Sequence, residues 1–183
     1  MERTAMGQSV KKLMVSAMFT AIIAVLAQVA IPLPIGIPVT LQTFAMALCG
    51  FILGWKYGGL SVLVYLLLGA VGVPVFASFH GGIGVLFGMT GGYLSGFLFM
   101  VALCGLGVNR KHKAASILLG IAGLAVCHIL GVIQFAAVSG SPMLYAFSVA
   151  SLPYLLKDVV SVVGAYFISL TVRRRLSEAG LVE

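Results

Sequence analysis

The chain has 183 residues, of which 61% are hydrophobic and only 8% charged, and its mean hydropathy is +1.18. So few polar residues cannot cover a soluble domain, which excludes that class and predicts an integral membrane protein with a single domain over residues 1–183. The formal net charge of +7 does not indicate nucleic-acid binding, because the basic residues gather at the chain ends and between apolar runs, as in membrane proteins.

The fold class predicted from these runs is all-α, with six transmembrane helices joined by short loops. Their approximate bounds are residues 13–31, 40–55, 58–73, 85–107, 114–138 and 148–172.

Lys and Arg follow the topology that such a bundle requires. They occur at both chain ends, at Lys56 in the second gap and in the cluster 109–113 in the fourth, but not in the first, third or fifth gap. The positive-inside rule therefore predicts cytoplasmic N- and C-termini in a multi-pass protein of the bacterial cytoplasmic membrane.

In the first run, Ala17 and Ala21 lie four residues apart and predict a generic helix-packing face. The gap after it, residues 31–38, contains three prolines and one glycine, which excludes a helix. Because this loop is apolar, we expect it either to lie on the bilayer or to fold over a cavity as a lid.

The second run begins with polar side chains at its outer end. Thr40 is a candidate helix N-cap, and the Gln42 amide offers both a donor and an acceptor to a ligand. The alternative is that Thr40 only caps the helix and Gln42 lies among lipid headgroups. Thr43 shares a helix face with Thr40.

Four glycines of the third gap and fourth run, at positions 84, 88, 92 and 96, recur at every fourth residue. That spacing predicts a smooth groove along one face of the 85–107 helix. The groove serves either close packing of another helix or the approach of a flat ligand to bare backbone.

The sixth run contains two adjacent charges, Lys157 and Asp158. A charge inside a membrane helix costs about 2.5 to 3.5 kcal/mol and so suggests a functional site. Successive helical residues point about 100° apart, so we expect the two not to pair but to have separate partners. With Tyr154 and Ser161 they form one polar arc near the outer surface; the alternative is that the charges only hold the bundle together.

The sequence gives little support for a metal site, a cofactor or a catalytic activity. Three single cysteines and three scattered histidines lack metal-site or disulfide spacing, so we expect neither a metal nor a cofactor. An enzymatic alternative would require Ser95 and His128 to act as a dyad. The sequence has no G-x-x-x-x-G-K-[ST] loop, so ATP hydrolysis would have to come from partner proteins.

Several motifs occur in order along nearly the whole chain: PVTLQTF at 38–44, GAVGVPVF at 69–76, GGIGVLFG at 81–88 and TGGY at 90–93. Together they resemble the BioY family, the biotin-capturing membrane subunits of energy-coupling-factor (ECF) transporters.

The resemblance implies a six-helix bundle that holds biotin near its outer face and is not itself an enzyme. Its partners would be a membrane coupling protein, which Ala17 and Ala21 would contact, and two ABC-type ATPases. By position, the resemblance implies ligand contacts from residues 40–43, the 79–84 stretch, Tyr93 and Asp158. Together with the polar arc, the candidate substrate-binding residues are Thr40, Gln42, Thr43, Phe79, Gly82, Tyr93, Tyr154, Lys157, Asp158 and Ser161.

One departure from the family concerns the lysine. Many relatives have it three residues after the aspartate, where this chain has Ser161, whereas Lys157 directly precedes Asp158. We expect Asp158 to accept hydrogen bonds from the ureido N–H groups of biotin. Lys157 then either balances that charge or reaches the biotin carboxylate, and Phe79 and Tyr93 pack on the rings and chain. The alternatives are capture of another vitamin, or a non-catalytic packing subunit of a membrane complex.

Overall fold

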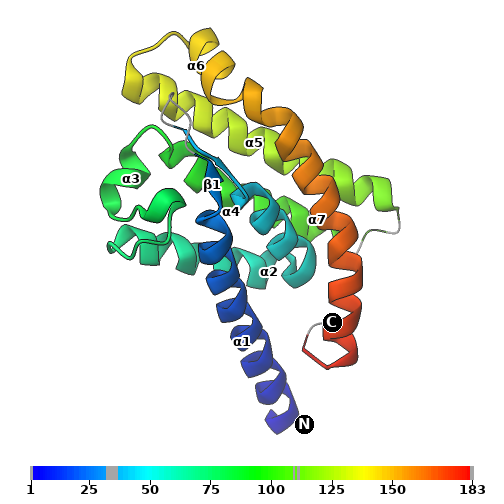
Figure 1. Ribbon diagram of the computed structural model, residues 1–183. Coiled ribbons are helices and arrows are strands. Elements are labelled where there is room, and N and C mark those ends of the chain that lie inside the picture. Colours follow the sequence, from blue (N-terminus) through cyan, green and yellow to red (C-terminus); the bar gives the residue numbers. More distant parts are fainter. Residues whose placement is uncertain (1, 32–36, 109, 111, 182–183) are drawn as a thin grey trace.

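The computed structural model describes residues 2–31, 37–108, 110 and 112–181, with side chains from residue 9 onward. Within these residues the protein is a helical bundle with one very short strand pair (Figure 1). The elements are α1 (Glu2–Ala27), β1 (Ala30–Ile31), β2 (Val39–Thr40), α2 (Gln42–Ala70), η1 (Ala77–Phe79), α3 (Ile83–Phe87), α4 (Gly91–Gly107), α5 (Lys113–Ser139), α6 (Met143–Ala150) and α7 (Leu152–Glu178).

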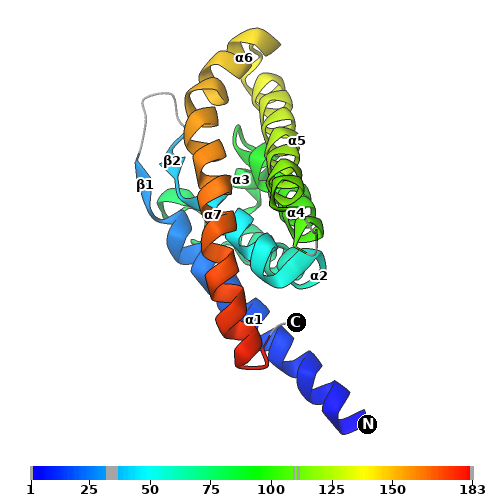
Figure 2. The same cartoon turned by 90° about the vertical axis from the view of Figure 1, so that its right-hand side faces the viewer.

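Four helices are long and apolar enough to cross a membrane, and α4 is a shorter apolar helix. The four are the Ser9–Ala27 part of α1, α2, α5 and α7. The start of α1 and the end of α7 lie at one end of the bundle, which we call the termini end (Figures 1 and 2). The β1–β2 pair and α6 lie at the opposite end, which we call the hairpin end. Large apolar side chains remain exposed along the helices, as a lipid-facing surface requires.

Helix α2 is folded back on itself at Gly54. This residue has φ 75° and ψ 179°, a conformation open to glycine but not to other residues. The Gln42 side-chain amide donates a 2.8 Å hydrogen bond to the Tyr65 hydroxyl, although 23 residues of straight helix would separate them by about 35 Å. The two limbs, residues 42–53 and 55–70, therefore run side by side and correspond to the predicted helices 40–55 and 58–73.

Helix α1 packs on the second limb of α2 through small polar side chains. The Thr20 hydroxyl donates to the Ser61 carbonyl at 3.0 Å, and the Ser61 hydroxyl donates to the Ser16 carbonyl at 3.0 Å. Ala17 and Ala21 lie on the other side of α1 and are exposed. Within the described residues, no segment buries the small-residue face predicted there.

The prediction of a continuous glycine groove is wrong, because the predicted 85–107 helix is broken. Helix α3 ends at Phe87 and α4 begins at Gly91, so the four glycines do not share a helix. The Gln134 amide of α5 stabilises the break by donating to the carbonyls of Leu86 and Gly88, both at 2.8 Å.

The later half of the glycine pattern does serve close packing between α4 and α5. A Cβ on Gly92 would lie 2.2 Å from the Leu130 carbonyl oxygen, and one on Gly96 would lie 2.7 Å from the Cys127 Cα. Any side chain at either position would therefore push the two helices apart.

Two other predicted helices also have different bounds. The 148–172 helix is two helices, because the chain departs from helical geometry at Ser151, between α6 and α7. The predicted first helix ends at Ala27, and residues 30–31 pair antiparallel with 39–40 instead. Thr40 is accordingly in a strand, and the residue that precedes α2 is Leu41. Residues 32–36 of the predicted loop or lid lie outside the described residues.

Candidate functional site

A cavity of about 380 Å³ opens at the hairpin end, lined by residues of β2, α2, η1, α3, α4, α5, α6 and α7 and of the loops between them. Its volume is that of a small-molecule site. One part of its wall is apolar and includes Phe76, Val85, Leu94, Phe97 and Leu124. The polar part comprises Thr40, Gln42, Thr43, Ser78, His80, Thr90, Tyr93, His128, Tyr154, Lys157 and Asp158.

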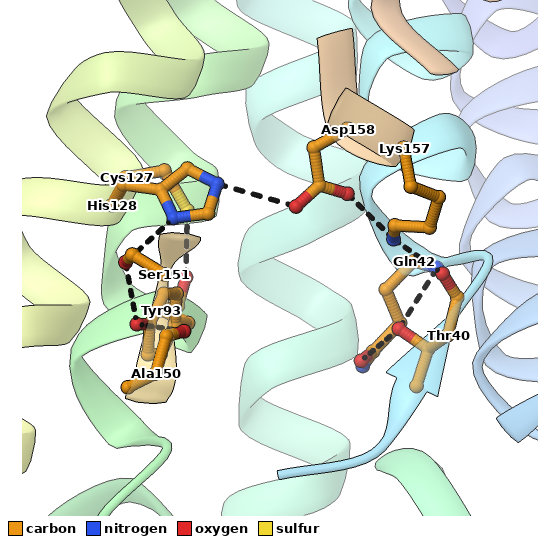
Figure 3. Close-up of polar contacts among 9 residues, drawn as sticks. All are labelled: Thr40, Gln42, Tyr93, Cys127, His128, Ala150, Ser151, Lys157 and Asp158. Atoms are coloured by element: carbon orange, nitrogen blue, oxygen red, sulfur yellow. Dashed lines mark hydrogen bonds and ion pairs between the residues drawn. The ribbon is translucent and has the colours of Figure 1, made fainter. Parts of the chain in front are cut away.

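Asp158 is the most buried charge of this wall, with 4% of its surface exposed. Its Oδ1 atom forms an ion pair with the Lys157 ammonium group, which also donates a 2.9 Å hydrogen bond to the Thr40 carbonyl (Figure 3). The prediction that Lys157 and Asp158 do not pair is therefore wrong. Their Cβ atoms do diverge, but the long lysine side chain bends back across the difference.

His128 of α5 approaches Asp158 from the other side (Figure 3). Its Nε2 lies 3.2 Å from Asp158 Oδ2, and its Nδ1 lies 2.8 Å from the Ser151 hydroxyl. Asp158 Oδ2 thus accepts from the histidine, whereas Oδ1 contacts the Lys157 ammonium. A carboxylate oxygen can accept more than one hydrogen bond, so Oδ1 keeps acceptor capacity for a further donor.

Tyr93 joins α4 to the turn between α6 and α7. Its hydroxyl donates to the Ala150 carbonyl at 2.6 Å and lies 2.9 Å from the Ser151 hydroxyl. The Tyr93 ring meets the His128 ring edge-on, with centroids 5.7 Å apart. The ring therefore lines the cavity while its hydroxyl is engaged by the protein.

The strand side of the cavity is also internally hydrogen-bonded. The Thr40 hydroxyl donates to Gln42 Oε1 at 3.1 Å, and Tyr154 donates to the Ile37 carbonyl at 2.6 Å. Gln42 is 7% exposed and bonded to Tyr65, so it is an interior residue and not one among lipid headgroups.

Three predicted site residues, Phe79, Gly82 and Ser161, lie outside the cavity lining. Ser78 and Phe79 have φ values of 57° and 59°, and this turn leaves the Phe79 side chain 70% exposed. The aromatic wall is supplied by Phe76, which is 2% exposed and packs edge-on against Tyr65. The expectation that Phe79 packs on a ligand therefore finds no support in the cavity lining and stays a prediction.

Ser151, His128 and Asp158 include the three group types of a hydrolytic triad, but the serine is not accessible. Ser151 is completely buried, is not part of the cavity lining and is shared with Tyr93. A nucleophile must reach its substrate, so Ser151 cannot act as one here. The three residues instead hold one another in position. The Ser95–His128 dyad is wrong, since the Ser95 hydroxyl donates to the Gly92 carbonyl.

Sequence reasoning named His128 only as half of the enzymatic alternative and missed Ser151. His128 carried a usable signal, a titratable side chain in the middle of an apolar run, which marks functional positions in membrane helices. Ser151 carried no such signal, because its importance comes from the helix break.

Comparison with known proteins gives consistent relatives. A family model described as the BioY family matches residues 1–178. A biotin transporter BioY of Thermotoga maritima is 41% identical over 167 residues, which are 90% of this chain and 96% of that protein. A probable biotin transporter BioY of Pyrococcus horikoshii is 36% identical over 159 residues, covering 87% and 94%. The crystal structure of the S-component for biotin from an ECF-type ABC transporter matches with a TM-score of 0.85 at 28% identity, covering 92% of this chain and 93% of that one.

Proposed function

The chain belongs to the BioY family, and from this premise we propose that it captures biotin in the hairpin-end cavity as the substrate-binding subunit of an ECF-type ABC transporter. It is a transport subunit and not an enzyme. Biotin is its ligand, and no cofactor is needed for that role.

The observation that carries this proposal is the buried Asp158 carboxylate in the cavity wall, whose Oδ1 contacts the Lys157 ammonium and keeps lone-pair capacity for a further donor. A buried carboxylate is costly to desolvate, and that cost falls when a ligand N–H donates to it. Biotin has a ureido ring with two N–H groups, and hydrogen bonds to a carboxylate are about twice as strong as neutral ones. Asp158 Oδ1 is therefore the proposed acceptor for the ureido ring.

The ion pair supports a charge-balancing role for Lys157. Its ammonium group touches Asp158 and is held by the Thr40 carbonyl, so it offsets the desolvated carboxylate where it stands. The Tyr93 ring and the apolar wall around Phe76 and Phe97 would then contact the thioether ring and aliphatic chain of biotin.

A membrane arrangement with cytoplasmic termini supports uptake from outside. Counting the two limbs of α2 separately, together with α1, α4, α5 and α7, gives the six proposed spans. At the termini end, the Lys56 ammonium lies 5.4 Å from the centre of the Trp55 ring, a combination typical of the membrane–water interface. The cavity would then open toward the outer side of the cell membrane, where biotin arrives.

The exposed Ala17 and Ala21 support a docking role for α1. Small residues four apart let another helix approach closely, and neighbouring Met14 and Met18 are 63% and 60% exposed. We place the membrane coupling protein on this face, with two ABC-type ATPases supplying the energy.

Calorimetric titration of biotin into purified, detergent-solubilised protein tests the proposal. We expect saturable one-to-one binding at micromolar or tighter affinity. Trp55 lies at the end opposite the cavity and would report poorly, so heat is the better signal. If the folded protein bound another vitamin more tightly than biotin, the proposed substrate would be wrong. If it bound no vitamin, the alternative of a packing subunit would be favoured.

A further inference from the structure

Asp158 is held by a chain of hydrogen bonds that reaches beyond the cavity (Figure 3). The chain runs from the Ala150 carbonyl through the hydroxyls of Tyr93 and Ser151 to the His128 ring and Asp158 Oδ2, with contacts of 2.6, 2.9, 2.8 and 3.2 Å. It joins α4, the break between α6 and α7, α5 and the second turn of α7.

The direction of the last contact is fixed by chemistry. An ionised carboxylate only accepts hydrogen bonds, so His128 Nε2 must carry the hydrogen and donate it to Oδ2. The other ring nitrogen, Nδ1, is held by Ser151, which is completely buried. The ring can therefore neither flip nor rotate without breaking both contacts.

This geometry leaves the two oxygens of Asp158 with different tasks. Oδ2 is hydrogen-bonded to α5, whereas Oδ1 contacts the Lys157 ammonium and keeps lone-pair capacity for a further donor. If the carboxylate rotated about its bond to Cβ, the oxygens would exchange and this remaining acceptor capacity would no longer have one fixed direction. The His128 donor on Oδ2 opposes this exchange.

We infer that His128 is a positioning residue that fixes the Asp158 carboxylate, through Ser151 and Tyr93, so that Oδ1 is presented to the ligand's N–H group. The inference rests on the proposed function for the identity of the ligand. It assigns part of the specificity for the N–H-bearing ring to the residues that hold the acceptor in place.

Two matched substitutions separate the roles of the two ring nitrogens. In His128→Gln the side-chain amide reaches about as far as Nε2 and retains a donor for Asp158. In His128→Asn the amide reaches only as far as Nδ1, so it retains a partner for Ser151 and loses Asp158. Both variants are neutral and polar, and they differ in which contact survives.

Asp158 is the only aspartate in the sequence, so selective [4-¹³C]aspartate labelling gives one side-chain carboxyl resonance that reports on it without any ligand. We expect His128→Asn to shift or broaden this resonance and His128→Gln to leave it close to the wild-type position. For biotin, we expect an affinity loss of roughly tenfold or more in His128→Asn and less than about threefold in His128→Gln.

A second ligand distinguishes positioning from general damage. A biotin analogue methylated on one ureido nitrogen lacks one N–H group, so wild-type protein should prefer biotin to it. That preference should shrink in His128→Asn and persist in His128→Gln, whereas a merely structural defect would weaken both ligands equally.

The inference is overturned if His128→Asn keeps the wild-type resonance and affinity, or if His128→Gln is altered as much as His128→Asn. Should His128→Asn fail to fold, Ser151→Ala decides instead, since freeing the ring should broaden the Asp158 resonance and an unchanged resonance contradicts the inference. If wild-type protein does not bind biotin, the proposed function fails, while the ligand-free spectra still decide the role of His128.

Discussion

Helix α7 has ion pairs near both of its ends, and they differ in their surroundings. Near its start, the side chains of Asp158 and Lys157 are 6% and 30% exposed. In its last turn, Glu178 pairs with Arg174 and Arg175 at 3.1 and 3.3 Å, and these side chains are 47%, 81% and 79% exposed. The chemical groups are alike, but Asp158 is buried and Lys157 only partly exposed, whereas all three side chains of the last turn are exposed.

The difference shows that a charge matters for function where it is buried and held by other helices and strands. Exposed pairs contribute about 0 to 1 kcal/mol because water already solvates both charges. The buried pair has little such solvent and is held by α5 and β2, through His128 and the Thr40 carbonyl. It therefore depends on the tertiary fold, and the remaining acceptor capacity of Asp158 Oδ1 is available to a ligand.

Removing the buried carboxylate should have the largest effect. We expect Asp158→Asn and Asp158→Ala each to lower biotin affinity by about 1.5 to 3 kcal/mol, roughly 10- to 150-fold, because a charged acceptor is lost. Calorimetric titration measures the loss, and Asp158→Asn serves as the matched control for side-chain volume. An Asp158→Ala variant that binds biotin within about twofold of wild type would contradict the assignment of Asp158 as the acceptor.

Changing the cation beside it should have an intermediate effect. Lys157→Met removes the charge and should weaken biotin binding by about 1 kcal/mol, roughly fivefold, since His128 still donates to Asp158 and Lys157 is partly exposed. Lys157→Arg keeps the charge and should lose less, which makes it the control.

The double variant tests whether the pair acts as a unit. Residues in contact are not independent, so Lys157→Met should cost little further affinity once Asp158→Asn is present. Additive losses, measured by the same titrations, would mean that Lys157 contacts the ligand itself and is not only a counter-ion.

Much of the fold, and the central residue of the candidate site, could be predicted from the sequence. The hydrophobic pattern placed the helix at 114–138 close to the observed α5, Lys113–Ser139, and it located the reversal in α2 within a few residues of Gly54. The cost of an intramembrane charge identified Asp158 as the residue to examine. These predictions succeed because they depend on local periodicity and on the free energy of burial.

The predictions that failed depend on contacts between distant segments. The helix after Gly84 breaks because the Gln134 amide, 46 residues beyond Gly88, hydrogen-bonds its carbonyls. Lys157 reaches Asp158 because of its side-chain conformation, which helical rotation does not determine. The role of His128 depends on its contact with Ser151, and that contact exists because the α6–α7 break places Ser151 beside the His128 ring.

The smallest effect should come from the exposed carboxylate. Glu178→Gln makes the same change from carboxylate to amide as Asp158→Asn, at the other end of α7. We expect the free energy of unfolding to fall by no more than about 0.5 kcal/mol and biotin affinity to stay unchanged, because both arginines remain solvated. At 1 M salt the Debye length is about 3 Å, so even this small loss of stability should vanish, whereas the affinity loss of Asp158→Asn should persist. Thermal unfolding and calorimetry at low and high salt measure both quantities. If Glu178→Gln weakened biotin binding as much as Asp158→Asn, burial would not be what separates the two ends of α7, and the termini end would have to be coupled to the cavity.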